Sequence, residues 1–391
     1  MSSSDLRNGE VGLFPELPTA GNEERTTGIL PSQAIRELIA SGRVSAAPAI
    51  QEQHIQPASL DLRLGDIAHR VQASFLPGPR TVESKIQELR MTRVDLTKAT
   101  VFEKGCVYIV PLLEELNLPK DISAIANPKS TTGRLDIFTR LITDRGVAFE
   151  YVPPGYTGKL YAEIASRTFT VAVRAGMRLN QIRFVRGKPR PADATISRLD
   201  EEEYLVYMDE ERTARARIDR GLRVTVNLEG SQPSEVVAYK ARRHAPAIEL
   251  DRIDHYSPEE FWEARTQPAS KSLILEPGDF YILASRERVR VPPEYAAEMV
   301  PFDPSAGEFR IHYAGFFDPG FGYGSSDIKG TRAVLEVRAH EVPFVVEHGQ
   351  VVGRLTYMPL LSRPDKIYGT NIGSSYQYQA LTLSKQFQRQ T

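Results

Sequence analysis

An internal repeat is the feature that most restricts how this chain can fold. The same residue types return 173 positions later, within runs that share one pattern of apolar and polar residues. The matched pairs are Gly105 and Gly278, Glu163 and Glu336, and Gly176 and Gly349. Because the repeat has the length of an ordinary domain, it indicates one structural unit that is used twice.

The runs inside each unit are typical of β-strands. Leu60, Leu62 and Leu64 alternate with polar residues before a turn at Gly65, which predicts a half-buried strand. Similar short runs, broken by glycine and proline, continue to about Arg186 and favour a sandwich or a small barrel. We therefore predict an all-β fold with minor helices.

Local signals place two helices and the borders of the units. Residues 30–39 carry apolar residues at helical spacing and stop at Gly42, and Ser257 caps a segment that continues with proline and glutamate. With 391 residues the chain exceeds the usual size of one domain. We expect a flexible leader over 1–27, a first unit over 28–200, a charged connection over 201–220 and a second unit over 221–391.

Composition excludes several classes of protein. The 49 basic and 50 acidic residues nearly cancel, so no overall field favours nucleic acid or a membrane, and an anionic ligand needs a local basic cluster. Cys106 is the only cysteine, which excludes an intrachain disulfide and the cysteine-rich zinc sites of many nucleobase deaminases. The seven histidines show no metal-ligand spacing. No apolar run is long enough to span a bilayer, and we expect a cytoplasmic protein.

Three signatures resemble those of a known family. They are residues 56–65 (QPASLDLRLG), residues 129–135 (KSTTGRL), and the paired runs 314–320 (AGFFDPG) and 334–336 (VLE). Together they resemble the signature segments of the dCTP deaminases, members of the trimeric dUTPase-like superfamily, in their long, duplicated bacterial form. The resemblance implies two tandem dUTPase-like distorted β-barrels, active sites between neighbouring barrels, and a homo-oligomer.

The resemblance also implies a reaction, the zinc-free hydrolytic deamination of dCTP to dUTP and ammonia, with the triphosphate held as a Mg²⁺ complex. Water that attacks C4 of cytosine needs a general base, and the departing amine needs a proton; one carboxylate with a raised pKa can serve both steps. Glu336 matches the family's catalytic glutamate by position, and so does Glu163 in the first unit. From the residues alone, a Glu336 side chain that points to solvent from an amphipathic strand remains an alternative.

The two copies differ, and the difference suggests a composite site. The first unit has Pro153 where the second has Asp318, whereas the second unit has Asp303 and Glu308 where the first has a basic segment. Acidic residues at that place would repel phosphate. We therefore expect one site that draws on both units. Its residues are Lys129, Ser130 and Arg134 from the first unit and Ala314, Asp318 and Glu336 from the second.

Side-chain chemistry assigns roles within the first unit's part of this site. Lys129 and Arg134 neutralise phosphate charge, and Arg134 also positions the water or the substrate. The hydroxyl of Ser130 contacts a phosphate or the water. A solvated turn after Asn127-Pro128 is the alternative interpretation of this segment.

The second unit and the tail supply the remaining contacts. Asp318 would accept a hydrogen bond from the sugar 3′-hydroxyl, although an Asp-Pro-Gly turn explains this residue without a ligand. The backbone of the small residue Ala314 would let the base approach closely. The tail is similar to the family's closing segment, which implies that Tyr376, Gln379 and Lys385 fold over the nucleotide; tails of this composition are also commonly disordered.

Three functions stay compatible with the sequence. A dCTP deaminase leads, with dCTP and dUTP as ligands. The second is a dUTP diphosphatase or an enzyme that does both steps, because Tyr156-Thr157-Gly158 faintly resembles the nucleotide-discriminating hairpin of that branch. The third is a non-catalytic nucleotide sensor, since duplicated domains often leave one copy inactive.

Overall fold

The computed structural model describes most of the chain, and strands dominate it. The described residues are 25–208, 214–230, 235–267, 269–301, 309–311, 315–323, 329–339, 341–369 and 381–389. Three of the predicted site residues, Ala314, Tyr376 and Gln379, lie outside these ranges, as do Asp303 and Glu308. The predicted all-β class with minor helices is confirmed.

The first half of the chain forms two main sheets. Its elements are β1 Gly28–Ile29, α1 Ser32–Ala40, β2 Val44–Ala46, the 3-10 turn η1 Glu52–His54, β3 Leu60–Arg63, β4 Ile67–Val71, α2 Val82–Leu89, β5 Arg90–Asp95, β6 Thr100–Phe102, β7 Val107–Asn117, β8 Ile122–Pro128, α3 Ser130–Gly133, β9 Ile137–Thr143, β10 Tyr151–Val152, β11 Thr157–Ser166, β12 Val171–Val173 and β13 Arg178–Arg186. One sheet has the order β1-β13-β8-β10 with β3 paired to β13, and the other has the order β5-β4-β7-β11-β9 with β2 paired to β7.

The second half repeats this arrangement. Its elements are α4 Asp193–Glu203, β14 Val206–Tyr207, β15 Leu222–Thr225, β16 Val236–Ala241, β17 Ile248–Glu249, α5 Pro258–Phe261, β18 Trp262–Thr266, β19 Ser272–Leu275, β20 Phe280–Val289, β21 Tyr295–Pro301, β22 Phe309–Ile311, β23 Phe316–Phe317, β24 Thr331–Ala339, β25 Phe344–Glu347 and β26 Val351–Pro359. The sheets have the orders β18-β16-β20-β24-β22, with β14 paired to β20, β15-β26-β21-β23, and β19-β25.

The register of the paired strands is the same in the two units. Glu163 on β11 lies opposite Ile109 of β7, and Glu336 on β24 lies opposite Ile282 of β20, so both copies keep the same pairing. Strand β3 of the first half also corresponds to β15 of the second, because β3 pairs with β13 as β15 pairs with β26. The glutamate and its neighbours therefore occupy equivalent places in the two units.

The local predictions hold, with one correction. The helix expected over 30–39 is α1, and the helix expected after Ser257 is the single turn α5. The strand expected around Leu60 is β3, but both of its faces are buried, because Asp61 and Arg63 point into ion pairs instead of solvent. In the part of the chain that the structure describes, no helix is long and apolar enough to cross a membrane.

Apolar side chains gather in two large clusters that follow the two halves closely but not completely. The first contains most of the inward-facing residues of β3 to β13, together with Trp262 and Phe387 from the second half. The second contains Leu335 and Val337 of β24. Helix α4 spans the border expected near residue 200 and packs its buried Ile196 in the second cluster. The domain borders proposed from the sequence remain predictions.

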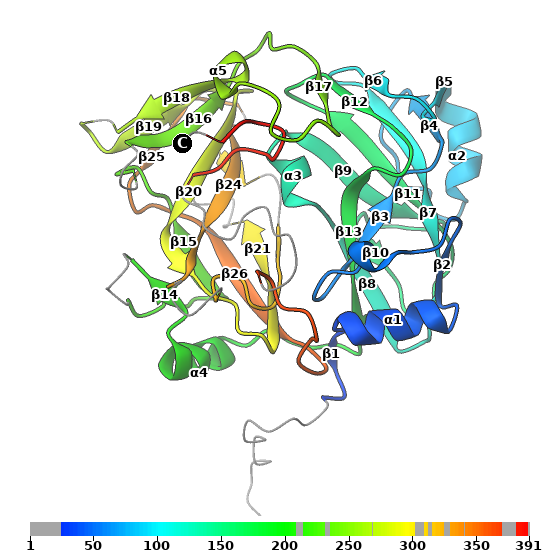
Figure 1. Ribbon diagram of the computed structural model, residues 1–391, viewed down its shortest axis with the longest axis horizontal. Helices are drawn as coiled ribbons and strands as arrows, with labels where there is room; N and C mark the ends of the chain where they lie inside the picture. The colour runs from blue at the N-terminus through cyan, green and yellow to red at the C-terminus, as the bar shows by residue number, and fades with distance from the viewer. Residues whose placement is uncertain are drawn as a thin grey trace, which may run out of the picture.

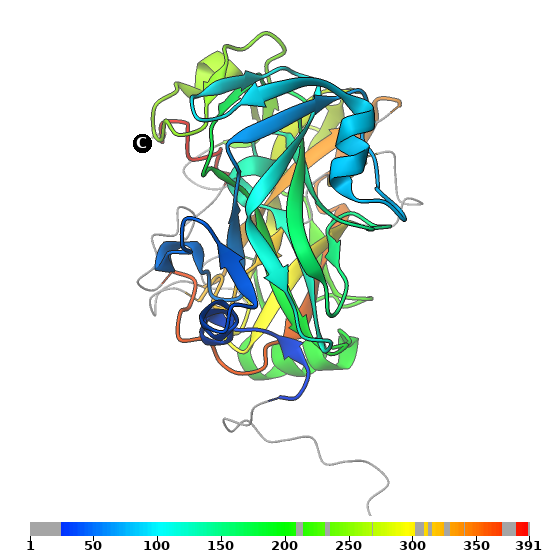
Figure 2. The ribbon, with the colours of Figure 1, turned by 90° about the vertical axis from the view of Figure 1, so that its right-hand side faces the viewer.

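The two halves lie side by side and share a long boundary (Figure 1). Strand β17 of the second half pairs with β12 of the first in a sheet of order β17-β12-β6. Helix α3 lies at the boundary, near the C-terminal segment 381–389. Helices α1 and α2 lie on the outside of the first half (Figure 2). The boundary is thus lined by strands and turns from both halves.

A buried glutamate at equivalent places of the two units predicts a difference in stability. Glu114 accepts hydrogen bonds from the backbone N of Arg63 (2.8 Å) and from its Nε (2.7 Å), whereas Glu287 accepts from the backbone N (2.8 Å) and Oγ1 (2.6 Å) of Thr225. Glu114→Gln leaves a buried arginine charge without its counter-ion, and we expect it to lower the free energy of unfolding by about 3–5 kcal/mol. Glu287→Gln breaks no direct ion pair, because Glu287 accepts from a backbone amide and a hydroxyl, and it should lower the free energy of unfolding by about 1–2 kcal/mol.

Urea unfolding of the two variants checks this ranking. Equal losses, or a larger loss for Glu287→Gln, would contradict it.

Candidate active site

A cavity of about 1150 Å³ lies at the boundary between the two halves. Its wall from the first half includes β3, the turn α3 and the start of β13, and its wall from the second half includes β23, the turn at Asp318 and β24. The C-terminal segment adds Lys385 and Gln386. Both repeat units and the C-terminal segment therefore contribute to the lining of one cavity.

The basic segment predicted at residues 129–134 forms a hydrogen-bonded turn that lines this cavity. Pro128 ends β8, Lys129 keeps an extended backbone, and the next four residues form the single turn α3. The backbone N of Lys129 donates to the carbonyl of Leu179 (2.8 Å), and Thr132 Oγ1 donates to the same carbonyl (3.0 Å). Strand β13 thus fixes the turn, which presents Lys129, Ser130 and Arg134 to the cavity.

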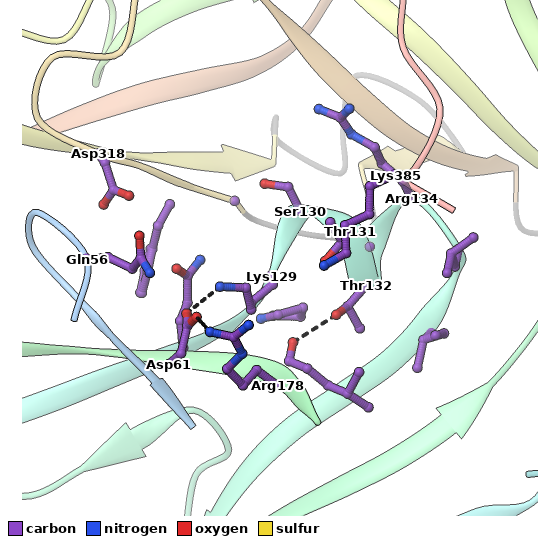
Figure 3. Close-up of a pocket in the computed structure, with 18 of the residues that line it drawn as sticks. Gln56, Asp61, Lys129, Ser130, Thr131, Thr132, Arg134, Arg178, Asp318 and Lys385 are labelled. Carbon is purple, nitrogen blue, oxygen red and sulfur yellow. Dashed lines mark hydrogen bonds and ion pairs between the residues drawn. The ribbon is translucent and has the colours of Figure 1, made fainter. Parts of the chain in front are cut away.

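Cations gather around one buried carboxylate at this end of the cavity. Asp61, 1% exposed, pairs with Lys129 Nζ through Oδ1 and with Arg178 through Oδ2 at 3.5 Å. Figure 3 shows both basic side chains directed at Asp61. Burial lowers the pKa of Lys385, and the charges of Lys129 and Arg178 lower it further. Lys129, Arg178 and Lys385 thus lie close enough for their charges to act on one another, and such a group of cations is suited to bind an anion.

Glu336 faces the cavity from β24. Its neighbours Leu335 and Val337 pack in the second core cluster, so the alternation of the strand turns Glu336 to the opposite face. Only 6% of the residue is exposed, and burial raises the pKa of its carboxyl from 4.5 to about 7, against the opposing charge of Arg134. A carboxyl with this pKa can accept and return a proton near neutral pH.

Asp318 lies in a turn that the first half holds in place. Gly320 has φ of +88°, and a Cβ there would lie 2.0 Å from a side-chain carbon of Ile367, so the turn requires glycine. Arg183, which is fully buried on β13, donates to the carbonyl of Phe317 (3.4 Å) and to Asp318 Oδ1 (3.5 Å). Burial raises the pKa of Asp318, and the charge of Arg183 opposes this rise.

Glu163, the first-unit counterpart of Glu336, does not line this cavity. Its Oε1 forms an ion pair with Arg140 (2.6 Å), which lies directly opposite it on β9. Arg140 in turn stacks over Phe149, with its guanidinium carbon 3.4 Å from the ring centre. The carboxylate of Glu163 is therefore held by a fixed counter-ion, in contrast to the carboxyl of Glu336.

The C-terminal segment is anchored beside the basic turn. Ser384 Oγ donates to the carbonyl of Thr131 (2.8 Å), and Arg134 donates to the carbonyl of Thr382 (3.1 Å). Gln386 Nε2 donates to the carbonyl of Leu250 (2.8 Å), and Phe387 packs among the rings around Trp262. These contacts place Lys385 at the cavity, as the closing-tail hypothesis requires of that residue.

The structure brings most of the described candidate residues together. Lining the one cavity are Lys129, Ser130, Arg134, Asp318, Glu336 and Lys385. The sequence interpretation gave no role to three further charged residues at this site, namely Asp61, Arg178 and Arg183. Asp61 stands within the 56–65 signature, so a polar residue inside an apolar strand was an available signal. The positions of Arg178 and Arg183 carry no comparable local signal.

No metal-ligand set accompanies these residues. Among the described residues, no three His, Cys, Asp or Glu side chains come together in a way that could hold a metal ion. Asp61, the carboxylate nearest the basic side chains, already has two cationic partners. The expectations of a zinc-free site and of Mg²⁺ bound through a triphosphate remain predictions.

Comparisons with known proteins cover nearly the whole chain. Residues 26–188 match the family model described as the 2′-deoxycytidine 5′-triphosphate deaminase (DCD) N-terminal domain, and residues 192–387 match the C-terminal domain of the same family. A crystal structure of 2′-deoxycytidine 5′-triphosphate deaminase from Agrobacterium tumefaciens is 50% identical, with a TM-score of 0.82, and the match covers 86% of this chain and 100% of that one.

Curated relatives match over a shorter stretch. A protein from Methanosphaera stadtmanae named "dCTP deaminase, dUMP-forming" is 30% identical over 159 residues, which are 40% of this chain and 78% of that protein. One from Methanobrevibacter smithii with the same name is 27% identical over 160 residues, 40% and 79% of the two chains. A "dCTP deaminase" from Halorubrum lacusprofundi is 29% identical over 160 residues, 40% and 76%. Each match has about the length of one repeat unit.

The buried carboxyl of Glu336 predicts a stability effect that depends on pH. Below pH 4.5 the carboxyl is protonated in both the folded and the unfolded chain. As the pH rises to about 7, the unfolded chain ionises while the folded chain keeps its proton, so stability falls. Above that range the full penalty applies, and a pKa difference of this size corresponds to about 3 kcal/mol. Glu336→Gln removes the ionisable group and should stabilise the protein by up to that amount at pH 8.5, and by much less at pH 5.

Urea unfolding at the two pH values measures the effect. Glu163→Gln is the matched control, because it breaks the ion pair with Arg140 and should destabilise at both. A Glu336→Gln variant less stable than the parent chain at pH 8.5 would contradict the assignment of a raised pKa.

Proposed function

This chain belongs to the 2′-deoxycytidine 5′-triphosphate deaminase family, and we propose that it hydrolyses dCTP to dUTP and ammonia in the cavity between its two halves. The observation that carries the proposal is the joint lining of this cavity by the Lys129–Arg134 turn of the first half and by Glu336 of the second. The family match over residues 26–188 and 192–387 supplies the reaction class.

The architecture we propose is a tandem pair of dUTPase-like distorted barrels, over residues 28–200 and 221–391. The equal registers of Glu163 and Glu336 and the two apolar clusters support this division. A homo-oligomer in the cytoplasm completes the proposal.

The substrate would lie with its triphosphate on the basic residues. Lys129, Arg178 and Lys385 supply charge at one end of the cavity, and Ser130 adds a hydroxyl. Mg²⁺ would enter on the triphosphate, held by phosphate oxygens and water, since it commonly binds in this way at nucleotide sites. Asp318, whose turn is held by Arg183, would accept a hydrogen bond from the sugar 3′-hydroxyl. Ala314, Tyr376 and Gln379 lie outside the described residues. For them we propose the roles that the family resemblance implies: the backbone of Ala314 beside the base, and Tyr376 and Gln379 folded over the nucleotide.

Glu336 would carry the protons of the reaction. As a carboxylate it accepts a proton from water while the water oxygen bonds to C4 of cytosine. It then returns a proton to the departing amino group, the bond from C4 to nitrogen breaks, and ammonia leaves with dUTP as the other product. The charge of Arg134 opposes the rise in the pKa of Glu336 and thereby favours the ionised form that the first step needs. Arg134 would also orient the water or the base through its fixed donors.

A second candidate function is deamination followed by hydrolysis of the triphosphate. The relatives from Methanosphaera stadtmanae and Methanobrevibacter smithii are named as dUMP-forming, and this observation favours the candidate. In that case the chain would release pyrophosphate and dUMP. Activation of a second water at the phosphates would need a base near Lys129 and Arg178, where Asp61 is held in two ion pairs.

Product analysis separates these functions. The protein is incubated with dCTP and Mg²⁺, and ammonia, dUTP, dUMP and pyrophosphate are followed over time. We expect ammonia and dUTP in equal amounts. Pyrophosphate with dUMP would instead support the two-step enzyme, and binding of dCTP without any product would support a nucleotide sensor and contradict the proposal.

Substitution of the two equivalent glutamates tests the assignment of the site. We expect Glu336→Gln to lower kcat by at least about 1000-fold, because the amide cannot accept the proton of water. Glu163→Gln should retain most of the activity, since this residue does not line the cavity. In the parent chain kcat should fall as the pH drops below about 7, where Glu336 becomes protonated. The opposite ranking of the two variants would exclude the assignment.

A further inference from the structure

A buried ion pair joins the two segments that carry Arg134 and Glu336. Arg338, two residues after Glu336 on β24, pairs with Asp136, two residues after Arg134. Asp136 is fully buried, and Arg338 is 6% exposed. Neither residue lines the cavity, so neither is placed to touch the substrate. The pair therefore connects the first half to the second at two positions that lie close in the chain to the proposed catalytic residues.

We propose that the Asp136–Arg338 pair is a positioning device that fixes Arg134 relative to Glu336 and so sets the rate of the chemical step. The inference rests on the proposed function, in which these two residues act on the base and the water. It adds two residues that neither the signature segments nor the family comparison singles out.

The contacts of the pair leave it little freedom. Arg338 donates from Nε to Asp136 Oδ2 (3.1 Å) and from a terminal nitrogen to Thr168 Oγ1 (2.6 Å), and Thr168 Oγ1 donates to the same carboxylate oxygen (2.6 Å). The other terminal nitrogen of Arg338 donates to the carbonyl of Gly278. All three guanidinium nitrogens are thereby bonded, in a closed network that spans both halves.

The backbone conformation at Asp136 suits an aspartate that pairs with Arg338. Asp136 has φ of 54°, in the left-handed region that glycine favours and that aspartate enters more often than most other residues. The position directly follows the basic turn, since the backbone N of Asp136 donates to the carbonyl of Gly133 (2.9 Å). Aspartate is therefore compatible with this backbone conformation, and its carboxylate forms the ion pair with Arg338.

The strand transmits the position of this pair to Glu336. Residues 336 and 338 share one face of β24, separated by about 6.6 Å along the strand. A displacement of Arg338 relative to Asp136 therefore displaces Glu336 relative to Arg134. The charge that acts on Glu336 is that of Arg134 from the basic turn, while Arg332 from its own strand and Lys385 from the C-terminal segment line the same cavity. Of these, Arg134 is the one whose charge opposes the rise in the pKa of Glu336.

The test uses a double variant, because removal of one partner leaves a buried charge and endangers folding. Asp136→Asn with Arg338→Met removes both charges. We expect the double variant to fold, with kcat per folded molecule lowered about 10- to 100-fold and KM for dCTP within about threefold of the parent value, as for a misplaced catalytic group. The pH at which kcat is half-maximal should rise, because Arg134 no longer lies where its charge favours ionised Glu336.

The matched control is Arg140→Met with Glu163→Gln, which removes an arginine–carboxylate pair within the first half, and neither of these residues lines the cavity. It should lower the melting temperature but leave kcat per folded molecule and its pH dependence unchanged. If the Asp136/Arg338 variant behaves like this control, the pair is structural only and the inference fails. If Glu336→Gln itself retains activity, the proposed function fails, and the positioning role fails with it.

Discussion

Buried arginines that cross from one half of the chain to the other hold the site together. Arg183 of the first half ends on the turn of Asp318 in the second, and Arg338 of the second half ends on Asp136 in the first. A guanidinium presents several donors in a rigid plane, so each contact restrains both distance and direction. Because burial of an arginine is unfavourable without a counter-ion, loss of the carboxylate at either place would leave an unpaired charge in an apolar environment. These two ion pairs therefore hold the two halves together beside the cavity.

The equivalent glutamates show how the same strand position acquires different chemistry. Glu163 and Glu336 have the same register against the preceding long strand, yet Glu163 lies opposite Arg140, and Glu336 meets the charge of Arg134 from the other half. Glu163 is thus engaged in an ion pair with a neighbour on its own sheet and does not line the cavity. A carboxyl buried in the cavity holds its proton more firmly, which is what acid and base catalysis at neutral pH requires.

The sequence predicts the fold well where the signal is local. Alternation of Leu60, Leu62 and Leu64 is sufficient for β3, and the repeat is sufficient to relate β24 to β11. The burial of both faces of β3 could not be predicted in this way, because it depends on Lys129, which follows β8, and on Glu114 of β7. For the site, the basic turn and Glu336 follow from signatures, whereas Arg183 and Asp136 act through partners about 130 to 200 positions away. Such contacts exist only after the two halves have packed.

Duplication explains why the cations can be concentrated on one side of the cavity. In a site built from two different surfaces, one half can keep the phosphate-binding turn and the other can keep the acid and base. Lys129 and Arg178 repel each other, and Asp61 between them makes their proximity tolerable in the absence of an anion. In the proposed site, an arriving triphosphate would compete with Asp61 for Lys129 and Arg178. This competition would weaken the binding of the phosphates and would speed the release of a charged product.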